Sequence, residues 1–477
     1  MYEKYLNFYL GITYTIIEGI HMELIGRQLY LEEMERRYAN KGVKTMALWG
    51  RRRIGKTAII RKFCEGKPHI ILTAVEDSYE RSIESFDRSL DMYLGEGPTH
   101  SNGFQDILDR FKLLDKETDR MVIVIDEYSY LCESEPSCKS YLQMFIDHDL
   151  QDMNAMLIIC GSALAVMGDI FNDSKGPLYK RFIGPISVGP LSYLECKAFH
   201  PEMGEEDLLR IYAIAGGVPL YHILMSGSTV EDCIKNSLLG PFAPLREEAD
   251  ATIMRELSPV QTNLKIVRAI SRGRVNIKEI SEFVDRTPEL CMNNLSKLQR
   301  IGIVSSLHPM CGASKKERIF RVTDGLVRLY NDVLMPNISA VTDPDKDFGY
   351  ESILPALNSF YGQAFEDECR QYISKKHRCK EIGSWWGKVS DVSTDIDIVA
   401  LCDDGEGEYH VVCECKFRNK EAGVREFEEL RNNAAYLKNC YNIRYCMFSR
   451  SGFTEELREM AESSGIELVT PGEMFSM

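Results

Sequence analysis

The sequence predicts an α/β protein with several domains: a parallel-sheet core with a helical lid, followed by a winged helix-turn-helix and a second α/β domain. Three observations lead to this prediction. The chain has 477 residues, which is enough for about three domains. Apolar runs typical of buried strands alternate with helical patterns in the first half, and a glycine-rich loop joins one such run to a helix. The domains are expected at residues 22–190 (core), 191–250 (lid), 251–335 (winged helix) and 350–477 (second α/β domain).

The composition is that of a soluble globular protein, with 44% hydrophobic and 27% charged residues. The net charge of −15 excludes a uniformly basic, histone-like protein. No apolar run reaches the ~18 residues that a membrane helix needs, so we expect no membrane partner. The 15 cysteines are scattered without a Cys-x-x-Cys pair. This pattern favours a reducing cytoplasm and disfavours both a disulfide framework and a structural zinc site of the usual spacing.

The segment GRRRIGKT (Gly50–Thr57) matches the phosphate-loop pattern G-x-x-x-x-G-K-[ST]. An apolar run precedes it and a helical pattern follows it, which is the context that the motif requires. Lys56 is expected to reach the β- and γ-phosphate oxygens of ATP, and Thr57 to hold Mg²⁺. The alternative is a glycine-rich turn with surface arginines. The predicted nucleotide-binding residues are Gly50, Arg51, Arg52, Arg53, Ile54, Gly55, Lys56, Thr57 and Ala58.

Two acids end the apolar run MVIVIDEY (Met121–Tyr128), which is typical of a fully buried parallel strand. Ligands bind at the carboxyl ends of such strands, so Asp126 is expected in the Mg²⁺ shell. Glu127 is expected to orient or deprotonate the attacking water. The alternative is a strand that ends in two solvated acids. A further apolar run ends in Ser162, whose hydroxyl is suited to sensing the γ-phosphate.

Seven segments occur in a characteristic order: LIGRQLYLEEMERRY (Leu24–Tyr38), LWGRRRIGKTAIIRKF, the strand ending in Asp126 and Glu127, CGSALAVM, GPLYKR (Gly176–Arg181), VGPLSY and GGVPLYH (Gly216–His222). In this order they resemble the archaeal-type ATPases of the STAND group, which are relatives of AAA+ proteins. The resemblance covers about residues 22–250. It implies ATP hydrolysis on an ASCE P-loop NTPase parallel sheet, with an additional strand between the two motifs and the strand order 5-1-4-3-2.

The same resemblance implies roles for three residues outside the loop. Arg27 is expected near the nucleotide entrance, and Pro219 on a small helical lid over the base. Arg181 is similar to an arginine that senses the charge of the γ-phosphate and is expected to be catalytic. Lys180 replaces the glycine that the family usually has before this arginine. The alternative for Arg181 is a surface arginine that caps a helix.

Residues 251–340 are basic, with 14 Lys or Arg against 8 Asp or Glu, and their pattern predicts three helices and a β-hairpin. Asn293, Lys297 and Arg300 are expected on the polar side of the third helix, opposite an apolar side. The hairpin tip carries Lys315, Lys316 and Arg318. A basic helix with a basic wing is typical of duplex DNA binding. The alternative is a module that packs only against the ATPase or a partner protein.

A segment rich in Pro, Asp and Asn, residues 335–350, is predicted to be a linker before the second α/β domain. In that domain Asp397 lies in DIDIV, and Glu414 and Lys416 lie two residues apart in CECK, so the last two share one face of a strand. Asp397 and Glu414 are expected to hold Mg²⁺, Lys416 to position water or stabilise charge, and Glu366 to add an acidic contact.

These residues resemble the core of PD-(D/E)xK nucleases, a restriction-endonuclease-like fold, over about residues 355–477. The departure from the pattern is that no proline precedes the aspartate. The alternative is a degenerate, non-cutting copy of the fold, in which the charges only link two strands.

The sequence therefore predicts a cytoplasmic protein that binds and hydrolyses ATP with Mg²⁺, associates with DNA and carries a Mg²⁺-dependent nuclease-like domain. The competing hypothesis is a STAND-type, nucleotide-dependent regulatory switch, whose winged helix and tail only bind partners or DNA. A third hypothesis, a motor that translocates DNA, lacks a pore-loop signature in the sequence. A homo-oligomer remains open under each of them.

Overall fold

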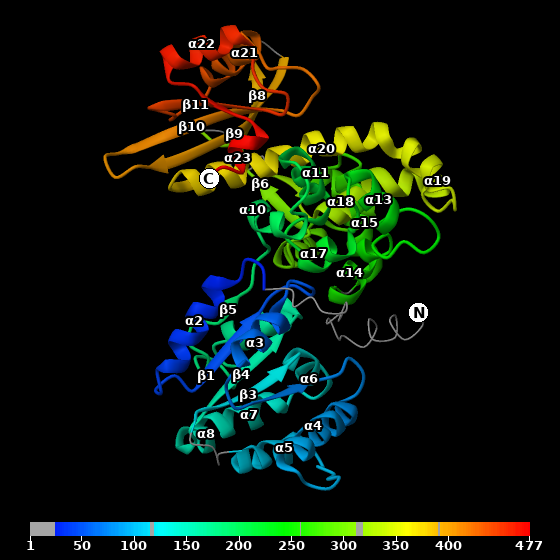
Figure 1. Cartoon of the computed structure of the whole chain (residues 1–477), viewed down its shortest axis with the longest axis vertical. Helices are drawn as coiled ribbons and strands as arrows, with labels where there is room; N and C mark the ends of the chain where they lie inside the picture. Colours follow the sequence, from blue (N-terminus) through cyan, green and yellow to red (C-terminus); the bar gives the residue numbers. More distant parts are fainter. Residues whose placement is uncertain (1–23, 115–118, 258, 312–317, 390–391) are drawn as a thin grey trace.

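The computed structural model of the chain describes residues 24–114, 119–257, 259–311, 318–389 and 392–477. Figure 1 shows a stack of three parts. The N-terminal sheet lies at the bottom of the view, a helical part with a small hairpin lies in the middle, and a second sheet lies at the top. Among the helices of these residues, none combines the length and the apolar character that crossing a membrane requires.

The first sheet is parallel and consists of β1 (Thr45–Trp49), β2 (His69–Thr73), β3 (Met121–Asp126), β4 (Ala155–Gly161) and β5 (Ile186–Ser187). Its spatial order is β2-β3-β4-β1-β5, which confirms the predicted order 5-1-4-3-2. Because consecutive residues of a strand point to opposite faces, β3 buries Val122 and Val124 on one side and Ile123 and Ile125 on the other. Both faces are therefore covered by helices, and the carboxyl ends of the strands share one edge.

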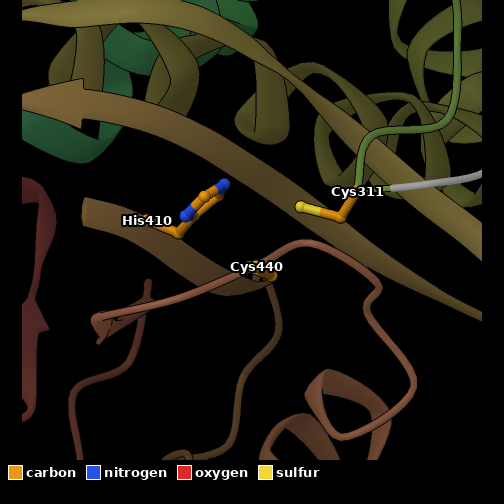
Figure 2. A group of neighbouring side chains, drawn as sticks. All are labelled: Cys311, His410 and Cys440. Atoms are coloured by element: carbon orange, nitrogen blue, oxygen red, sulfur yellow. The ribbon is translucent and has the colours of Figure 1, made fainter. Parts of the chain in front are cut away.

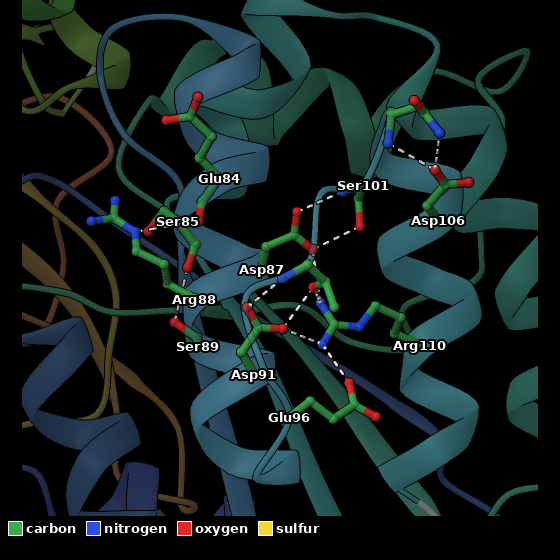
Figure 3. A network of polar contacts seen from close by, with 12 residues as sticks. Glu84, Ser85, Asp87, Arg88, Ser89, Asp91, Glu96, Ser101, Asp106 and Arg110 are labelled. Carbon is green, nitrogen blue, oxygen red and sulfur yellow. Dashed lines mark hydrogen bonds and ion pairs between the residues drawn. The ribbon is translucent and has the colours of Figure 1, made fainter.

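The helices of this part are α2 (Gln28–Ala39), α3 (Lys56–Cys64), α4 (Tyr79–Leu94), α5 (Phe104–Phe111), α6 (Tyr128–Ser134), α7 (Cys138–Asp147), α8 (Asp149–Asp152) and α9 (Leu164–Asn172), with the 3₁₀ turn η1 (Lys112–Leu114). A polar network joins α4 to α5 (Figure 3). In it Arg110 forms ion pairs with Asp87 at 2.8 Å, Asp91 at 2.6 Å and Glu96 at 3.0 Å. The mostly buried Arg110 neutralises two mostly buried acids, so the network stabilises this pair of helices.

The middle part begins with α10 (Tyr193–Cys196), η2 (Lys197–Phe199), α11 (Glu205–Ala215), α12 (Pro219–Leu224), α13 (Val230–Ser237) and α14 (Glu248–Glu256). It continues with α15 (Val260–Ser271), α16 (Ile277–Val284), α17 (Pro288–Arg300) and the antiparallel strands β6 (Val304–Leu307) and β7 (Ile319–Val322). Three helices followed by a hairpin are the elements that the sequence predicted here.

The predicted linker at residues 335–350 is wrong. After α18 (Gly325–Leu329) and the π-helical turn η3 (Tyr330–Leu334), this segment forms η4 (Met335–Asn337), α19 (Ile338–Val341) and the start of α20 (Lys346–Lys376). Asp345 caps α20 by accepting hydrogen bonds from the N–H groups of Asp347 and Phe348. The acidic residues that suggested a linker thus begin a helix of 31 residues, which packs on the middle part with one stretch and on the second sheet with another.

The second sheet is mixed, with β8 (Cys379–Val389), β9 (Val392–Asp403), β10 (Glu408–Lys416), β11 (Ile443–Ser449) and β12 (Glu467–Val469) in the order β12-β11-β10-β9-β8. β8, β9 and β10 pair antiparallel, whereas β10, β11 and β12 pair parallel. The helices α21 (Val424–Ala434), α22 (Glu455–Ser464) and α23 (Pro471–Met474) connect or follow the parallel strands. This arrangement brings α20, β9 and β10 together.

Candidate functional site

The phosphate loop lies between the end of β1 at Trp49 and the start of α3 at Lys56. Gly50 has φ 158° and Gly55 has φ 97°, backbone angles that residues other than glycine rarely adopt. A Cβ atom on Gly50 would also lie 2.6 Å from the carbonyl oxygen of Val188. The loop therefore requires glycine at both ends of the tight turn that begins the helix.

Lys56 and Thr57 face the inner side of the loop and the neighbouring acidic strand. The Nζ of Lys56, with only 5% of the residue exposed, donates to the carbonyl oxygens of Gly50 at 2.9 Å and Arg51 at 3.1 Å. The Oγ1 of Thr57 donates to Oδ2 of Asp126 at 2.9 Å. A hydroxyl and a carboxylate oxygen are hard ligands at hydrogen-bond distance, so this pair fits a Mg²⁺ site.

Glu127 is hydrogen-bonded to Ser162, the residue that follows β4. Its Oε2 accepts hydrogen bonds from the Oγ of Ser162 at 2.7 Å and from the backbone N–H of Ser162 at 3.1 Å. Glu127 itself has φ 54°, an uncommon value for a residue with a side chain, and its N–H donates to Asp126. The two residues predicted to act on water and on the γ-phosphate are thus in direct contact, through one of the two carboxylate oxygens of Glu127.

Two of the three loop arginines form ion pairs with acids of the middle part. Arg51 pairs with Asp324, which is buried at the start of α18, and Arg53 pairs with Glu248 at the start of α14. Arg52 instead contacts Glu76 at 3.1 Å within the ATPase part. The predicted arginines are therefore at the loop, with their side chains engaged by protein acids. Their partners carry no local sequence signal, because each is far away in the chain.

Arg27 and Pro219 border the loop, as the resemblance implied. The guanidinium of Arg27 donates to the carbonyl oxygens of Ile54 at 2.8 Å and Gly189 at 2.9 Å, and burial lowers the pKa of Arg27. Pro219 is the first residue of α12, and its Cγ lies 3.9 Å from the position of a Cβ on Gly55. Arg27 thus fastens the loop from one side and α12 covers it from another. Ala58 lies in the first turn of α3.

Arg181 is not brought to the phosphate loop within this chain. Its guanidinium makes two hydrogen bonds to Asp147, at 2.8 and 2.7 Å, and its carbonyl oxygen accepts from Thr45. Thr45 is the first residue of β1, whereas the loop follows the last residue of that strand. A charge-sensing role for Arg181 therefore requires the phosphate site of another copy, and it stays a prediction.

The polar side of α17 is open to solvent, as predicted, with Asn293, Lys297 and Arg300 exposed. The opposite side buries Cys291, Leu295 and Leu298 in the core of the middle part, which confirms the helical periodicity. Arg318 is also exposed, just before β7. Lys315 and Lys316, the other predicted basic residues of the hairpin tip, lie outside the described residues.

The second sheet collects the predicted carboxylates at the junction of α20, β9 and β10. Oδ2 of Asp397 accepts a hydrogen bond of 2.7 Å from the N–H of Cys415, between Glu414 and Lys416. Lys416 forms an ion pair with Glu414. Burial, reinforced by the charge of Glu414, raises the pKa of Asp397 to about 7. Burial, reinforced by Asp397, likewise raises the pKa of Glu366 to about 7, and burial also raises the pKa of Glu414.

Arg370 is part of this site and was missed in the sequence. Its Nη2 donates to Oε2 of Glu366 at 3.2 Å, to the carbonyl oxygen of Asp397 at 2.8 Å and to Oγ of Ser384 at 2.9 Å. Arg370 lies one helical turn after Glu366 on α20, so the spacing of the pair was visible, although the direction of the side chain was not. The repulsion between Asp397 and Glu414, which would be relieved by a divalent cation, is the feature of this site that fits metal binding.

The comparisons with known proteins agree with the first of these two sites. Residues 24–224 match a family model described as an ATPase domain predominantly from Archaea. A Walker-type ATPase of Pyrococcus abyssi superposes with a TM-score of 0.50 and 18% sequence identity, over 65% of this chain and 97% of its own. At that identity the likeness shows the fold alone. The loop, the acidic strand and the family match together define a P-loop ATPase domain.

A second family model covers part of the C-terminal half of the chain. Residues 330–429 match a family model described as "Archaea bacterial proteins of unknown function". An uncharacterized protein of Methanocaldococcus jannaschii is 26% identical over 389 residues, which are 80% of this chain and 84% of that protein. The chain is thus an ATPase of the P-loop type, with a C-terminal region similar to proteins of unknown function.

Proposed function

We propose that the chain hydrolyses ATP with Mg²⁺ at the phosphate loop, contacts DNA through a winged helix, and carries a C-terminal nuclease-like domain that acts on DNA. Support for the nuclease-like domain is the convergence of Asp397, Glu414, Lys416 and Glu366 from β9, β10 and α20. That convergence is the observation on which the proposal depends, because the string E-x-K alone is frequent by chance.

At the phosphate loop, the backbone N–H groups of residues 50–57 and the ammonium of Lys56 would hold the phosphates of ATP. Thr57 and Asp126 would hold Mg²⁺, which neutralises charge on the phosphate oxygens. Glu127 would orient the attacking water and accept its proton. Ser162 donates to Oε2 of Glu127, and the other carboxylate oxygen, Oε1, would accept the proton from water.

Glu127→Gln tests this assignment. We expect the variant to bind ATP with unchanged affinity and to hydrolyse it about 10²-fold to 10⁴-fold more slowly, the usual range for a lost general base. Glu133→Gln is the matched control, because Glu133 is an exposed acid on the neighbouring helix α6. Equal turnover by wild type and Glu127→Gln would remove the proposed role.

At the C-terminal site, Asp397 and Glu414 would hold Mg²⁺, and the metal would polarise a phosphodiester for attack by water. Lys416 would stabilise negative charge that develops on the phosphate, or position the water. Arg370 holds Glu366 and the backbone of Asp397 in place. Protein with Mg²⁺ or Mn²⁺ is expected to nick supercoiled plasmid DNA, and Lys416→Ala is expected not to.

The control for the nicking assay is Lys420→Ala, an exposed lysine shortly after β10. Nicking that persists in Lys416→Ala, or that is lost equally in both variants, would count against the nuclease assignment. Calorimetric titration of the nucleotide-free chain with Mn²⁺ gives a second readout. Under the proposal Asp397→Asn binds less Mn²⁺ than wild type, whereas a domain that only binds partners shows no difference.

The winged-helix proposal is supported by three helices with a hairpin and by the exposed polar side of α17. If Lys297 and Arg300 contact phosphates, replacing both with alanine weakens DNA binding and makes its salt dependence shallower by about two counterions. The charge-matched control replaces Lys41 and Lys62, which are exposed lysines of the ATPase part. Equal loss in both double variants would assign the effect to net charge.

A nucleotide-dependent switch is the second candidate, favoured by the ion pairs of Arg51 with Asp324 and of Arg53 with Glu248. Nucleotide at the loop would shift the position of the middle part only if it binds two arrangements with different affinities. Asp324→Asn keeps the hydrogen-bond acceptor that caps α18 and removes the charge that holds Arg51. We expect a changed ATP affinity, and no change in the control Asp345→Asn, a cap of α20.

A further inference from the structure

Cys311, His410 and Cys440 form a cluster that neither the ATPase site nor the carboxylate site uses. Cys311 follows β6, His410 lies on β10, and Cys440 lies in the loop between α21 and β11. One potential ligand atom from each residue lies within 4.8 Å of the other two, and within the described ranges no other group of three such residues meets this criterion. Figure 2 shows His410 and the sulfur of Cys311 facing one another above the loop that carries Cys440.

The donor set is two sulfurs and one imidazole nitrogen. Thiolate and imidazole are the ligands that Zn²⁺ prefers, whereas Mg²⁺ and Ca²⁺ require oxygen. In a tetrahedral site with Zn–S bonds of about 2.3 Å, two sulfurs lie about 3.8 Å apart. The three potential ligand atoms lie within 4.8 Å of one another, which exceeds that spacing by about 1 Å at most. Three protein ligands leave the fourth position for water or an added donor.

The backbone holds the three segments together independently of the side chains. Met310 donates its N–H to the carbonyl oxygen of Ser384 at 2.9 Å, and Lys438 donates its N–H to the carbonyl oxygen of Cys311 at 2.9 Å. Pro309 and Ser384 also form an isolated β-bridge. The segment before the hairpin tip is thus fixed on β8 and on the loop of Cys440, so ligands from distant parts of the chain are already in place.

Three residues in these segments have left-handed backbone conformations. Cys311 has φ 55°, Asn439 has φ 58° and Asn442 has φ 51°. Such a conformation is costly for Cys311 and persists where the surroundings enforce it, whereas asparagine adopts it more readily.

His410 is oriented so that one ring nitrogen remains for a metal. Its Nδ1 lies 3.1 Å from the carbonyl oxygen and 3.3 Å from the backbone nitrogen of Tyr441. The backbone of Tyr441 therefore occupies Nδ1, and Nε2 is the nitrogen that can coordinate. A backbone carbonyl on the second ring nitrogen is the usual way in which metal-binding histidines are oriented.

We propose that Cys311, His410 and Cys440 bind a Zn²⁺ ion that fastens the hairpin of the middle part to the second sheet. The two cysteines are partly exposed and give the ion a path from solvent, while His410 is buried and fixes the position of the site. The sequence disfavoured zinc because no Cys-x-x-Cys pair exists, but this site is assembled from three distant segments. It is independent of the proposed nuclease chemistry.

The test uses the full chain, stripped with a chelator, reloaded with Zn²⁺, desalted and assayed for metal by mass spectrometry. Wild type is expected to retain about one zinc ion per chain, as a single site of this kind predicts. Cys311→Ser and Cys440→Ser are expected to lose most of it. Cys379→Ser should retain the ion, because Cys379 faces Cys402 at 3.2 Å in the same sheet but lies outside the cluster.

Two further readouts separate this site from the alternatives. Asp397→Asn should keep its zinc, which excludes metal held by the carboxylates. Co²⁺ in place of Zn²⁺ should give a thiolate-to-cobalt absorption band in wild type that is lost in Cys440→Ser. The proposal is overturned by a reloaded wild type without zinc, by equal zinc in wild type and Cys311→Ser, or by a Cys311–Cys440 disulfide in protein purified under reducing conditions.

Discussion

The phosphate loop and the carboxylate site of the second sheet both hold acids on strands, but the surroundings of these acids differ: Asp126 ends β3, whereas Asp397 lies in the middle of β9. Asp126 receives hydrogen bonds from the hydroxyl of Thr57 and the N–H of Glu127. Asp397 receives one from the N–H of Cys415 and faces other acids, whose repulsion adds to burial and raises its pKa to about 7. Under the proposed function, the first site would receive a negative ligand together with its metal, whereas the second would lose protons when it binds a cation.

The largest expected effect separates the two sites directly. Lys56→Ala removes the cation that would contact the phosphates, so ATP hydrolysis is expected to fall by about 10²-fold or more. Mn²⁺ binding at the second sheet should be unchanged, since no residue of the loop contributes to it. Steady-state phosphate release and calorimetry measure the two quantities. Lys62→Ala, an exposed lysine on the same helix, is expected to behave as wild type. A loss of both ATP hydrolysis and Mn²⁺ binding in Lys56→Ala would show that the two sites are coupled.

Arg110→Ala tests the ion-pair network between α4 and α5, which we expect to affect stability and not ligand binding. It leaves the buried Asp87 without its cation, so the free energy of unfolding should fall by about 3 kcal/mol in a urea titration. ATP turnover of the folded fraction should stay at the wild-type level. The control is Arg88→Ala, which replaces an exposed arginine on α4, the helix that carries Asp87, and should change stability by less than about 0.5 kcal/mol. Lost turnover with unchanged stability would contradict a structural role.

The raised pKa of Asp397 predicts a pH dependence for stability. The folded chain keeps a proton that an unfolded aspartate, with its pKa of 3.8, has already released. The free energy of unfolding should therefore fall as the pH rises from about 4 to about 7. Asp397→Asn, which cannot ionise, should remove about 3 kcal/mol of this fall. Urea titrations at the two ends of the range measure it.

The control for this pH dependence is Asp403→Asn on the same strand, because the hydrogen bond from Lys380 lowers the pKa of Asp403. That variant should not reduce the decline above pH 4. A wild-type profile that rises between about pH 4 and about pH 7 would show that the carboxylates are ionised and well paired in the folded chain, which contradicts the contrast with the phosphate loop.

The smallest effect is expected for Arg181→Ala. Its ion pair with Asp147 is partly exposed, so stability should fall by no more than about 1 kcal/mol. ATP turnover of dilute protein should not change, because Arg181 lies at the other end of β1 from the loop. Turnover measured over a range of protein concentrations checks this. A loss that appears only at high concentration would assign Arg181 to the phosphate site of a neighbouring copy.

Features encoded in contiguous stretches were readable from the sequence. The loop of residues 50–57, the buried strand ending in Asp126 and Glu127, and the apolar side of α17 all follow from spacing within one element. The strand order was also predicted correctly, although it came from the resemblance to a known family. Local spacing failed at residues 335–350, because the same Pro, Asp and Asn residues that suit a linker also cap and begin helices.

Tertiary structure decided which side chains from distant segments meet. Packing between elements decides four features of this protein. They are the pairing of Arg51 with Asp324, the position of Arg181 at the far end of β1, the insertion of Arg370 among the acids, and the grouping of Cys311, His410 and Cys440. Hydrogen bonds and ion pairs are short-ranged and directional, so they form only where the backbone has already brought their partners together. Contacts between residues that are hundreds of positions apart have no period or spacing that one sequence can reveal.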